Sequence, residues 1–302
     1  MQTRLGLSCG FAVNRYPEPK EWLRIVGEEL GLRTCQFVAD LLNPFLPPDV
    51  IRHQTGRLLE NAERYNVTIE TTFTGAYTRL NHLLHPDVEQ RRVWLDWWKR
   101  FLDLSRELGA RGAGGHFGIL SVADLNHPQR REQLVEEGVA SWRELARHGA
   151  EIGLDFLIFE PMSIPRELAH TVDETQALLD RFADGMPIPM LLNLDVDHGD
   201  VSSPDPRDTD PYAWLETFGA ISPVVHIKQS SADKSRHSPF TTQYNAVGRI
   251  EPEQVLAALE RSGAQDVALI LELSWREREP FESRVLDDLR ESVAFWRPYV
   301  KD

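Results

Sequence analysis

Four polar residues stand at the ends of apolar runs, and their types suit metal binding and proton transfer. Glu160 ends the run FLIFE, Asp195 ends LLNLD, His226 follows two valines, and Glu272 follows VALIL. Successive members are 35, 31 and 46 residues apart, which is about one strand–helix repeat each. An unpaired acid in an apolar run is costly, so each needs a partner or a metal. We therefore expect the four side chains to meet at one site.

Two glutamates, one aspartate and one histidine form an oxygen-rich ligand set with a single nitrogen. This set favours Mg²⁺ or Mn²⁺, with Co²⁺ as a further candidate, over a structural zinc that prefers cysteine and histidine. The alternative is that each residue is an isolated polar group paired within the protein. Matched placement at four strand ends favours the metal site.

Three further residues are candidates for the lining of the same pocket. His198 lies three residues beyond Asp195, His116 follows a glycine pair, and Glu70 lies in the segment IETTFTG. Each could contact the substrate or support a metal ligand. The alternative for each is a core residue whose polar atoms are satisfied by a neighbouring strand.

A cluster of hydrogen-bond donors follows His226, and it is a candidate phosphate site. Its members are Lys228, Gln229, Ser230, Ser231 and Arg249, with Lys234 and Arg236 nearby. Phosphate sites in barrel enzymes often use the loops after the seventh and eighth strands. The alternative is a solvated loop with ordinary basic residues.

Short apolar runs alternate with amphipathic segments along the whole chain. Eight runs are typical of buried parallel strands: residues 5–12, 34–39, 67–73, 112–117, 156–159, 190–195, 224–228 and 267–273. Helices are expected between them, for example over 89–108 and 251–263. The pattern predicts a single α/β domain, residues 1–302, folded as a (β/α)₈ barrel with its active site at the carboxyl ends of the strands. Residues 202–211 and 230–248 are expected to be long polar loops on that face.

Composition excludes several classes of function. The net charge of −14 opposes nucleic-acid binding. No apolar run reaches the ~18 residues of a membrane span. Cys9 and Cys35 are too few for a disulfide framework, so we expect reduced thiols and a cytoplasmic protein.

The four strand-end residues resemble the metal ligands of the xylose isomerase-like barrel family of sugar isomerases and epimerases, which includes D-tagatose 3-epimerase. The segments 69–75, 194–200, 226–231 and 271–276 are similar to those of tetrulose-phosphate 3-epimerases of erythritol and threitol breakdown. The resemblance covers essentially the whole chain. It implies one divalent metal ion bound by Glu160, Asp195, His226 and Glu272.

The resemblance also implies an activity, the C3 epimerisation of an erythrulose phosphate through a metal-stabilised enediolate. Glu160 and Glu272 would then act as acid and base on opposite faces of the substrate. An aldose–ketose isomerase, a free-ketose 3-epimerase and a dehydratase remain alternatives, as does a non-catalytic sugar-binding barrel. A nuclease of the same fold is opposed by the acidic charge. The expected partner is a small sugar phosphate, and a homo-oligomer is compatible with this interpretation.

Overall fold

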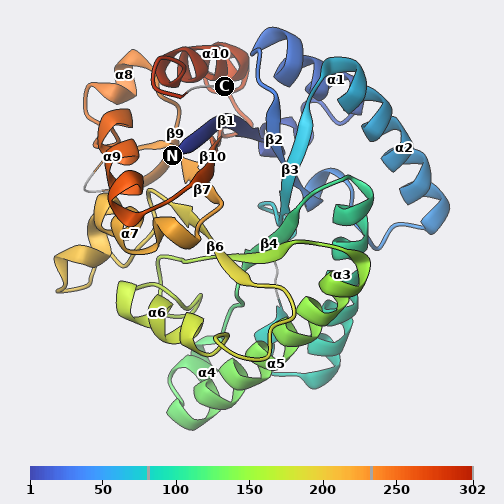
Figure 1. Ribbon diagram of the computed structural model, residues 1–302, viewed down its shortest axis with the longest axis vertical. Coiled ribbons are helices and arrows are strands. Elements are labelled where there is room, and N and C mark those ends of the chain that lie inside the picture. Colours follow the sequence, from blue (N-terminus) through green and yellow to red (C-terminus); the bar gives the residue numbers. More distant parts are fainter. Residues whose placement is uncertain (80–81, 232–233, 301–302) are drawn as a thin grey trace.

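Eight parallel strands close into a barrel with helices around it (Figure 1). The computed structural model describes residues 1–79, 82–231 and 234–300. Neighbouring strands follow the order β1-β10-β7-β6-β5-β4-β3-β2. Their bounds are β1 Gln2–Ser8, β2 Thr34–Val38, β3 Thr68–Phe73, β4 Gly112–His116, β5 Phe156–Glu160, β6 Met190–Asp195, β7 Val224–Ile227 and β10 Asp266–Leu271. The prediction of a (β/α)₈ barrel is confirmed.

Helices separate the strands along the chain and form the outer layer of the barrel (Figure 1). They are α1 Pro19–Arg24, α2 Pro48–Tyr65, α3 Val88–Glu107, α4 Val122–Leu125, α5 Pro128–Ile152, α6 Val172–Asp180, α7 Pro211–Phe218, α8 Thr242–Asn245, α9 Pro252–Ser262 and α10 Val285–Trp296. The two helices expected over 89–108 and 251–263 correspond to α3 and α9. Helix α9 begins with Pro252 and ends at Gly263, which has a φ of 85°, as helix boundaries favour.

The core lies between the barrel and its helices. Trp97, Trp98 and Phe101 on α3 are fully buried, and Trp142 on α5 packs against Trp98 with ring centroids 4.9 Å apart. Burial of large aromatic side chains contributes strongly to folding. This layer packs the helices onto the barrel, and the parallel pairing of the strands places their carboxyl ends at one face.

An ion-pair network closes the amino end of the barrel. Arg4 on β1 pairs with Asp266 and lies 2.6 Å from Glu70 Oε1, and Arg111 lies 3.5 Å from the same oxygen. These residues stand at or near the starts of their strands. Ion pairs at this end stabilise the fold, because it is the face opposite the active site.

Three sequence expectations need correction. The first strand ends at Ser8, whose side chain caps a 3-10 turn over Cys9–Ala12. Segment 230–248 is not all loop, because β8 (Gln229–Ser231) pairs with β9 (Lys234–Ser238), and α8 follows. Segment 202–211 contains a 3-10 turn over Pro206–Thr209, capped by Asp205. Short capped turns of this kind carry no apolar periodicity, so the sequence pattern does not show them.

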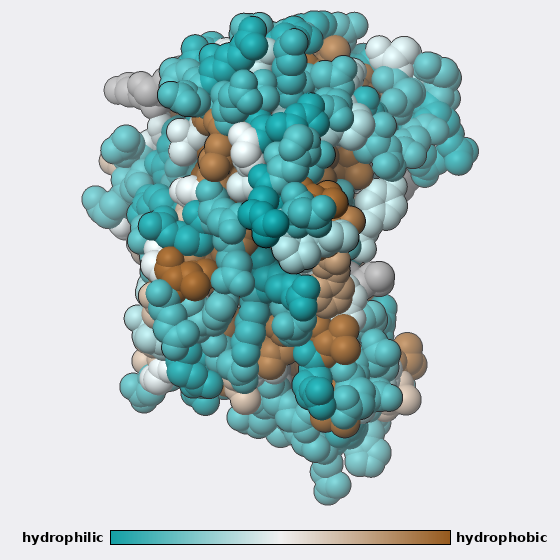
Figure 2. All heavy atoms as spheres, turned by 90° about the vertical axis from the view of Figure 1, so that its right-hand side faces the viewer, coloured by the Kyte–Doolittle hydropathy of each residue, from teal (hydrophilic) through white to brown (hydrophobic). Residues whose placement is uncertain are grey.

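The face shown in Figure 2 is mostly hydrophilic, with scattered apolar residues between the polar ones. In the described part of the chain, no helix is both long and apolar enough to cross a membrane.

Candidate active site

Four neighbouring strands bring Glu160, Asp195, His226 and Glu272 together at the carboxyl end of the barrel. Glu160 ends β5, Asp195 ends β6, His226 lies in β7, and Glu272 follows β10 directly. The backbone register places Asp195 opposite His226. One ligand atom from each residue lies within 4.8 Å of the others. Residues spread over 113 positions of the chain therefore form one compact donor set.

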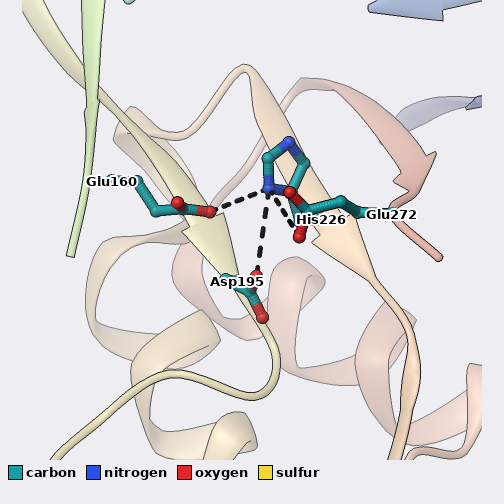
Figure 3. Close-up of side chains that lie close together, drawn as sticks. All are labelled: Glu160, Asp195, His226 and Glu272. Atoms are coloured by element: carbon teal, nitrogen blue, oxygen red, sulfur yellow. Dashed lines mark hydrogen bonds and ion pairs between the residues drawn. The ribbon is translucent and has the colours of Figure 1, made fainter. Parts of the chain in front are cut away.

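The imidazole of His226 is the centre of this set. Its Nδ1 lies 2.8 Å from Glu160 Oε1, 3.5 Å from Glu272 Oε2 and 3.9 Å from Asp195 Oδ2 (Figure 3). Its Nε2 lies 2.6 Å from Gln36 Oε1. An amide oxygen can only accept, so Nε2 carries a hydrogen, while Nδ1 faces the three carboxylates and is the nitrogen whose lone pair becomes available to a metal ion when Nδ1 is deprotonated. This is the tautomer that a metal-binding histidine requires.

Gln36 is itself held in place by a buried polar layer inside the barrel. Its Nε2 donates to Thr71 Oγ1 at 3.1 Å and to Asn193 Oδ1 at 3.0 Å. Gln36 is completely buried. The amide cannot rotate without breaking these bonds, so its oxygen stays directed at His226. Partners of this kind orient metal ligands and tune their basicity.

Lys228 lies against the same carboxylates, two residues beyond His226. Its Nζ donates to Asp195 Oδ2 and, at 2.6 Å, to Glu272 Oε2, and the side chain is fully buried. Burial alone would lower the pKa of Lys228, but Asp195, Glu272 and Glu160 raise it above its ordinary value. The ammonium therefore stays charged and is part of the site.

The electrostatics of the donor set suit a divalent cation. Burial alone raises the pKa of Glu272, but His226, Lys228 and His237 outweigh burial and hold this pKa well below its usual value. The pKa of Asp195 is also lowered, because neighbouring cations outweigh burial. Three carboxylates and one ammonium carry a formal charge of −2. A divalent ion balances that charge, and the oxygen-rich donors with one imidazole fit Mg²⁺ or Mn²⁺.

A cleft of about 280 Å³ opens beside the donor set. Glu160 and Glu272 line it, as do His116 at the end of β4 and residues from the segments that follow β1, β2, β3, β5, β6 and β10. Two acids therefore face a space large enough for a small organic molecule. A concave site at this face of a barrel, with acids and a candidate metal site, is the usual position for catalysis.

Residues 26–299 match the family described as the xylose isomerase-like TIM barrel. The chain belongs to this family. It is 43% identical over 301 residues to the D-erythrulose 1-phosphate 3-epimerase of Brucella abortus (strain 2308), and the match covers 99% of this chain and 97% of that protein. The chain is an enzyme of the isomerase class.

Solved structures of sugar epimerases share the fold. The D-psicose 3-epimerase of Clostridium cellulolyticum H10 superposes with a TM-score of 0.72 at 18% identity, over 99% of this chain and 100% of that chain. An L-ribulose 3-epimerase superposes with a TM-score of 0.74 at 16% identity, over 99% of this chain and 95% of that chain. At these identities the likeness establishes the barrel and its topology.

His116 and His198 both lie in the lining of the cleft. His198 Nε2 is 3.7 Å from Asp195 Oδ2, and its Nδ1 donates to the carbonyl oxygen of Pro161 at 3.0 Å. Burial, together with the charges of Arg79 and His198, lowers the pKa of His116 to about 3. His116 is therefore neutral at physiological pH and can act as a hydrogen-bonding group of the pocket.

Glu70 does not reach the cleft. It is the third residue of β3, and its carboxylate pairs with Arg4 and Arg111 at the amino end of the barrel. The expectation that it lines the pocket is wrong. A residue near the start of a parallel strand lies at the opposite end of the barrel from the catalytic face.

The hydrogen-bond donors that follow β7 lie outside the lining of the cleft. Lys228 is buried among the carboxylates, and Gln229 is buried with its amide bonded to Asn245 and to the backbone of Ile250. Ser230 is also buried. The lining of the cleft contains none of the five predicted residues, Lys228, Gln229, Ser230, Ser231 and Arg249.

Arg249 is used within the structure instead of at the cleft. It donates to the carbonyl oxygen of Thr209 at 2.7 Å, and its Nε lies 3.4 Å from Ser230 Oγ. The role of this cluster in phosphate binding stays a prediction, and the side chains of Lys228, Gln229 and Arg249 already bind other groups of the protein. Lys234 has a side chain outside the described part of the structure, and Arg236 is absent from the cleft lining.

The sequence pattern did not lead us to two residues of the site. Gln36 interrupts the apolar run of β2, which is the same kind of signal that marked the four ligands. His237 lines the cleft, and its Nδ1 lies 3.2 Å from Glu272 Oε2. It lies in β9, within the segment that was expected to be loop, so nothing in the local pattern placed it near the acids.

Proposed function

We propose that the chain catalyses the metal-dependent C3 epimerisation of a phosphorylated four-carbon ketose, an erythrulose phosphate. The observation that carries the proposal is the pair Glu160 and Glu272, which approach the same imidazole nitrogen from β5 and β10 and both line the cleft. Sugar binding alone does not need two acids of this kind. The 43% identity to a D-erythrulose 1-phosphate 3-epimerase supports the choice of substrate.

Glu160, Asp195, His226 and Glu272 would hold the metal ion, which we propose is Mg²⁺ or Mn²⁺. When bound, a divalent ion supplies electrostatic stabilisation to the oxygen of a neighbouring ketone as it gains negative charge. Lys228 keeps the Asp195 and Glu272 carboxylates oriented. Gln36 keeps the Nδ1 lone pair of His226 directed at the site.

The two glutamates would then move the proton. One carboxylate accepts the proton from C3, and the electron pair of the broken C–H bond passes into the C2 carbonyl to give an enediolate. The other glutamate, as the protonated acid, donates a proton to C3 from the opposite face. The configuration at C3 inverts, and the pair exchanges roles in the reverse direction.

The proposal is tested by ¹H NMR in D₂O on phosphorylated tetruloses with and without Mn²⁺ or Mg²⁺. We expect metal-dependent exchange of the C3 proton for deuterium, with formation of the C3 epimer. An aldose product would indicate an isomerase, and loss of water a dehydratase. Equal turnover with and without added metal after treatment with a chelator would contradict the metal-dependent mechanism.

Substitution of the two acids provides a second test. Glu160→Gln and Glu272→Gln keep the side-chain shape and remove the proton carrier, so each should abolish epimerisation at saturating metal while the far-UV circular dichroism stays that of the wild type. Glu144→Gln, a surface residue on α5 that pairs with Lys99, is the control. Wild-type turnover in either site variant would rule out the two-acid mechanism.

We also propose that residues 1–302 act as a single domain in the cytoplasm, in the breakdown of erythritol or threitol. Cys9 and Cys35 are buried free thiols, which is compatible with a reducing compartment. Size-exclusion chromatography with light scattering would show whether the barrel forms a homo-oligomer.

A further inference from the structure

An acidic enzyme needs local positive charge if it is to bind a phosphate ester. The chain carries a net charge of −14, and the donors after β7 are engaged elsewhere. Within the described lining of the cleft there are two arginines, Arg15 after β1 and Arg79 after β3. They differ in how much of their hydrogen-bonding capacity the protein already uses.

Arg15 is committed to the protein. Its Nε lies 2.9 Å from both carboxylate oxygens of Glu282, and its Nη2 lies 2.8 Å from one of them. The same guanidinium also donates to the backbone oxygens of Trp275 and Phe11. The side chain is only 10% exposed. Arg15 therefore links the segments after β1 and β10 and has little capacity left for a ligand.

Arg79 has far more of its guanidinium available. Its Nη2 lies 2.7 Å from Glu167 Oε1, and this is its one ion pair in the part of the chain that the structure describes. The side chain is 44% exposed. A guanidinium has five N–H donors in a rigid fork. The fork can bind two phosphate oxygens while the contact with Glu167 is kept.

The backbone that carries Arg79 is held in place before any ligand binds. Asp40 accepts from the backbone N–H groups of Tyr77 at 2.9 Å and Thr78 at 2.7 Å. Arg79 N–H donates to Gly75 O at 2.9 Å. A Cβ on Gly75 would lie 2.2 Å from Asp40 Oδ2, so only glycine lets the turn close around this carboxylate. A preorganised turn of this kind lowers the entropic cost of binding.

Arg79 also stands near the reacting groups. His116, which forms a hydrogen bond with the Arg79 backbone, is the strand neighbour of Glu160. A group bound at Arg79 would therefore lie on the β3–β5 side of the cleft, whereas Lys228 and His226 lie on the β7 side of the donor set. A short substrate could be bound at its carbonyl end by the acids and at its phosphate end by Arg79.

We propose that Arg79 binds the phosphate group of the substrate and sets the preference of the enzyme for phosphorylated ketoses. This inference rests on the proposed function. The phosphate accepts hydrogen bonds from the guanidinium fork, and Asp40 acts as a positioning residue through the turn 75–79. Binding energy gained at the phosphate, away from the reacting carbon, holds a small substrate in its reactive orientation.

The test compares Arg79→Gln and Arg79→Lys with the wild type on a phosphorylated tetrulose and on the free tetrulose. Arg92→Gln is the matched control, because Arg92 is an exposed arginine on α3 with one acid partner, Glu89. We expect Arg79→Gln to lower the ratio of kcat/KM for the ester to kcat/KM for the free sugar about 10- to 100-fold. Arg79→Lys should lose less, since it keeps the charge but not the fork. Inorganic phosphate should inhibit the wild type competitively and Arg79→Gln much more weakly.

The outcomes separate this inference from the proposed function. A wild type that prefers the ester, with an unchanged ratio in Arg79→Gln, would overturn the role of Arg79 and leave the proposed substrate intact. An equal loss on both substrates would also overturn it, because the residue would then act on the fold or the reacting end. A wild type with no preference for the ester would instead remove the phosphorylated substrate from the proposed function.

Discussion

Gln36 sets the tautomer of His226, although it lies 190 residues away in the chain. Its oxygen accepts from Nε2, and its own nitrogen is held by Thr71 and Asn193. The imidazole therefore cannot place its hydrogen on Nδ1 without losing a buried hydrogen bond. One amide thus controls whether the histidine can donate a lone pair to a metal.

Replacement of Gln36 should weaken metal binding. We expect Gln36→Leu to raise the dissociation constant for Mn²⁺ about 10- to 100-fold, the usual effect of losing a hydrogen-bond partner of a metal ligand. Isothermal titration calorimetry measures it directly. Thr71→Val is the control, because it removes one bond to Gln36 and leaves the contact with His226. Equal affinities in Gln36→Leu and the wild type would show that the tautomer is set by something else.

Lys228 should matter for both substrates and for folding. Lys228→Met leaves the buried carboxylate of Asp195 and the partly exposed carboxylate of Glu272 without their cation, so the free energy of unfolding should fall by about 3–5 kcal/mol. Turnover should fall on phosphorylated and free ketoses alike. Lys99→Met removes a surface pair with Glu144 and should cost at most about 1 kcal/mol. Urea unfolding and kcat/KM on both sugars provide the comparison. A loss confined to the phosphate ester would restore Lys228 as a phosphate ligand.

At the scale of elements, β4 is unusual because three of its five residues are glycines. The strand needs them, since its neighbours approach very closely. A Cβ on Gly114 would lie 1.7 Å from the carbonyl oxygen of Ile158 on β5. The glycines let β4 and β5 pair, and this pairing aligns His116 with Glu160.

An added methyl group should separate these two strands. We expect Gly114→Ala to lower the free energy of unfolding by about 1–3 kcal/mol or more, as overpacking does, and to reduce turnover because Glu160 moves. Gly56→Ala is the matched control. Gly56 is an exposed position in α2 with nothing within 4 Å of a new Cβ, so alanine should stabilise the helix by about 0.5–1 kcal/mol. Thermal or urea unfolding that ranks the two variants in the opposite order would contradict this account of β4.

The hairpin of β8 and β9 is the element that completes the site. It directs the chain back over the donor set after β7, and so it brings His237 to 3.2 Å from Glu272. The cleft is thus bounded by a feature beyond the eight strand–helix repeats. Long connections at this face of a barrel are commonly functional.

At the scale of the whole molecule, the protonation of His116 makes the free energy of unfolding depend on pH. Its pKa is about 3 in the folded protein and about 6.5 when exposed. Between these values the unfolded state binds more protons, so stability is lost as the pH falls from 6.5 towards 3. The loss due to this one group is at most about 1.4 kcal/mol per pH unit.

Removal of the imidazole should reduce this acid sensitivity. We expect His116→Asn to show a shallower fall in unfolding free energy than the wild type between pH 6.5 and 4.5, with no such difference in slope above pH 7. Urea unfolding at several pH values measures both slopes. His53→Asn, at an exposed site on α2, is the control and should follow the wild type. Parallel curves for His116→Asn and the wild type would show that His116 is already protonated or solvated in the folded state.

The sequence alone determined the barrel and the four residues of the donor set. Buried parallel strands have apolar sequences, and an acid or imidazole at the end of such a run is a local signal of a functional group. Because every strand of a barrel points the same way, matched positions at strand ends become neighbours in space. Glu70 was misplaced although its position near the start of its strand carried the same kind of information.

Only the tertiary structure decided which charged groups are engaged and which are available. Lys228 and Arg249 follow β7 in a pattern that favours a phosphate site, yet carboxylates and backbone oxygens from distant segments already bind them. Arg79 lies in no recognisable sequence motif, but the turn around Asp40 holds it at the cleft. It makes one ion pair among the described residues. The partners of a long charged side chain come from segments far apart in the sequence, so no local pattern specifies them.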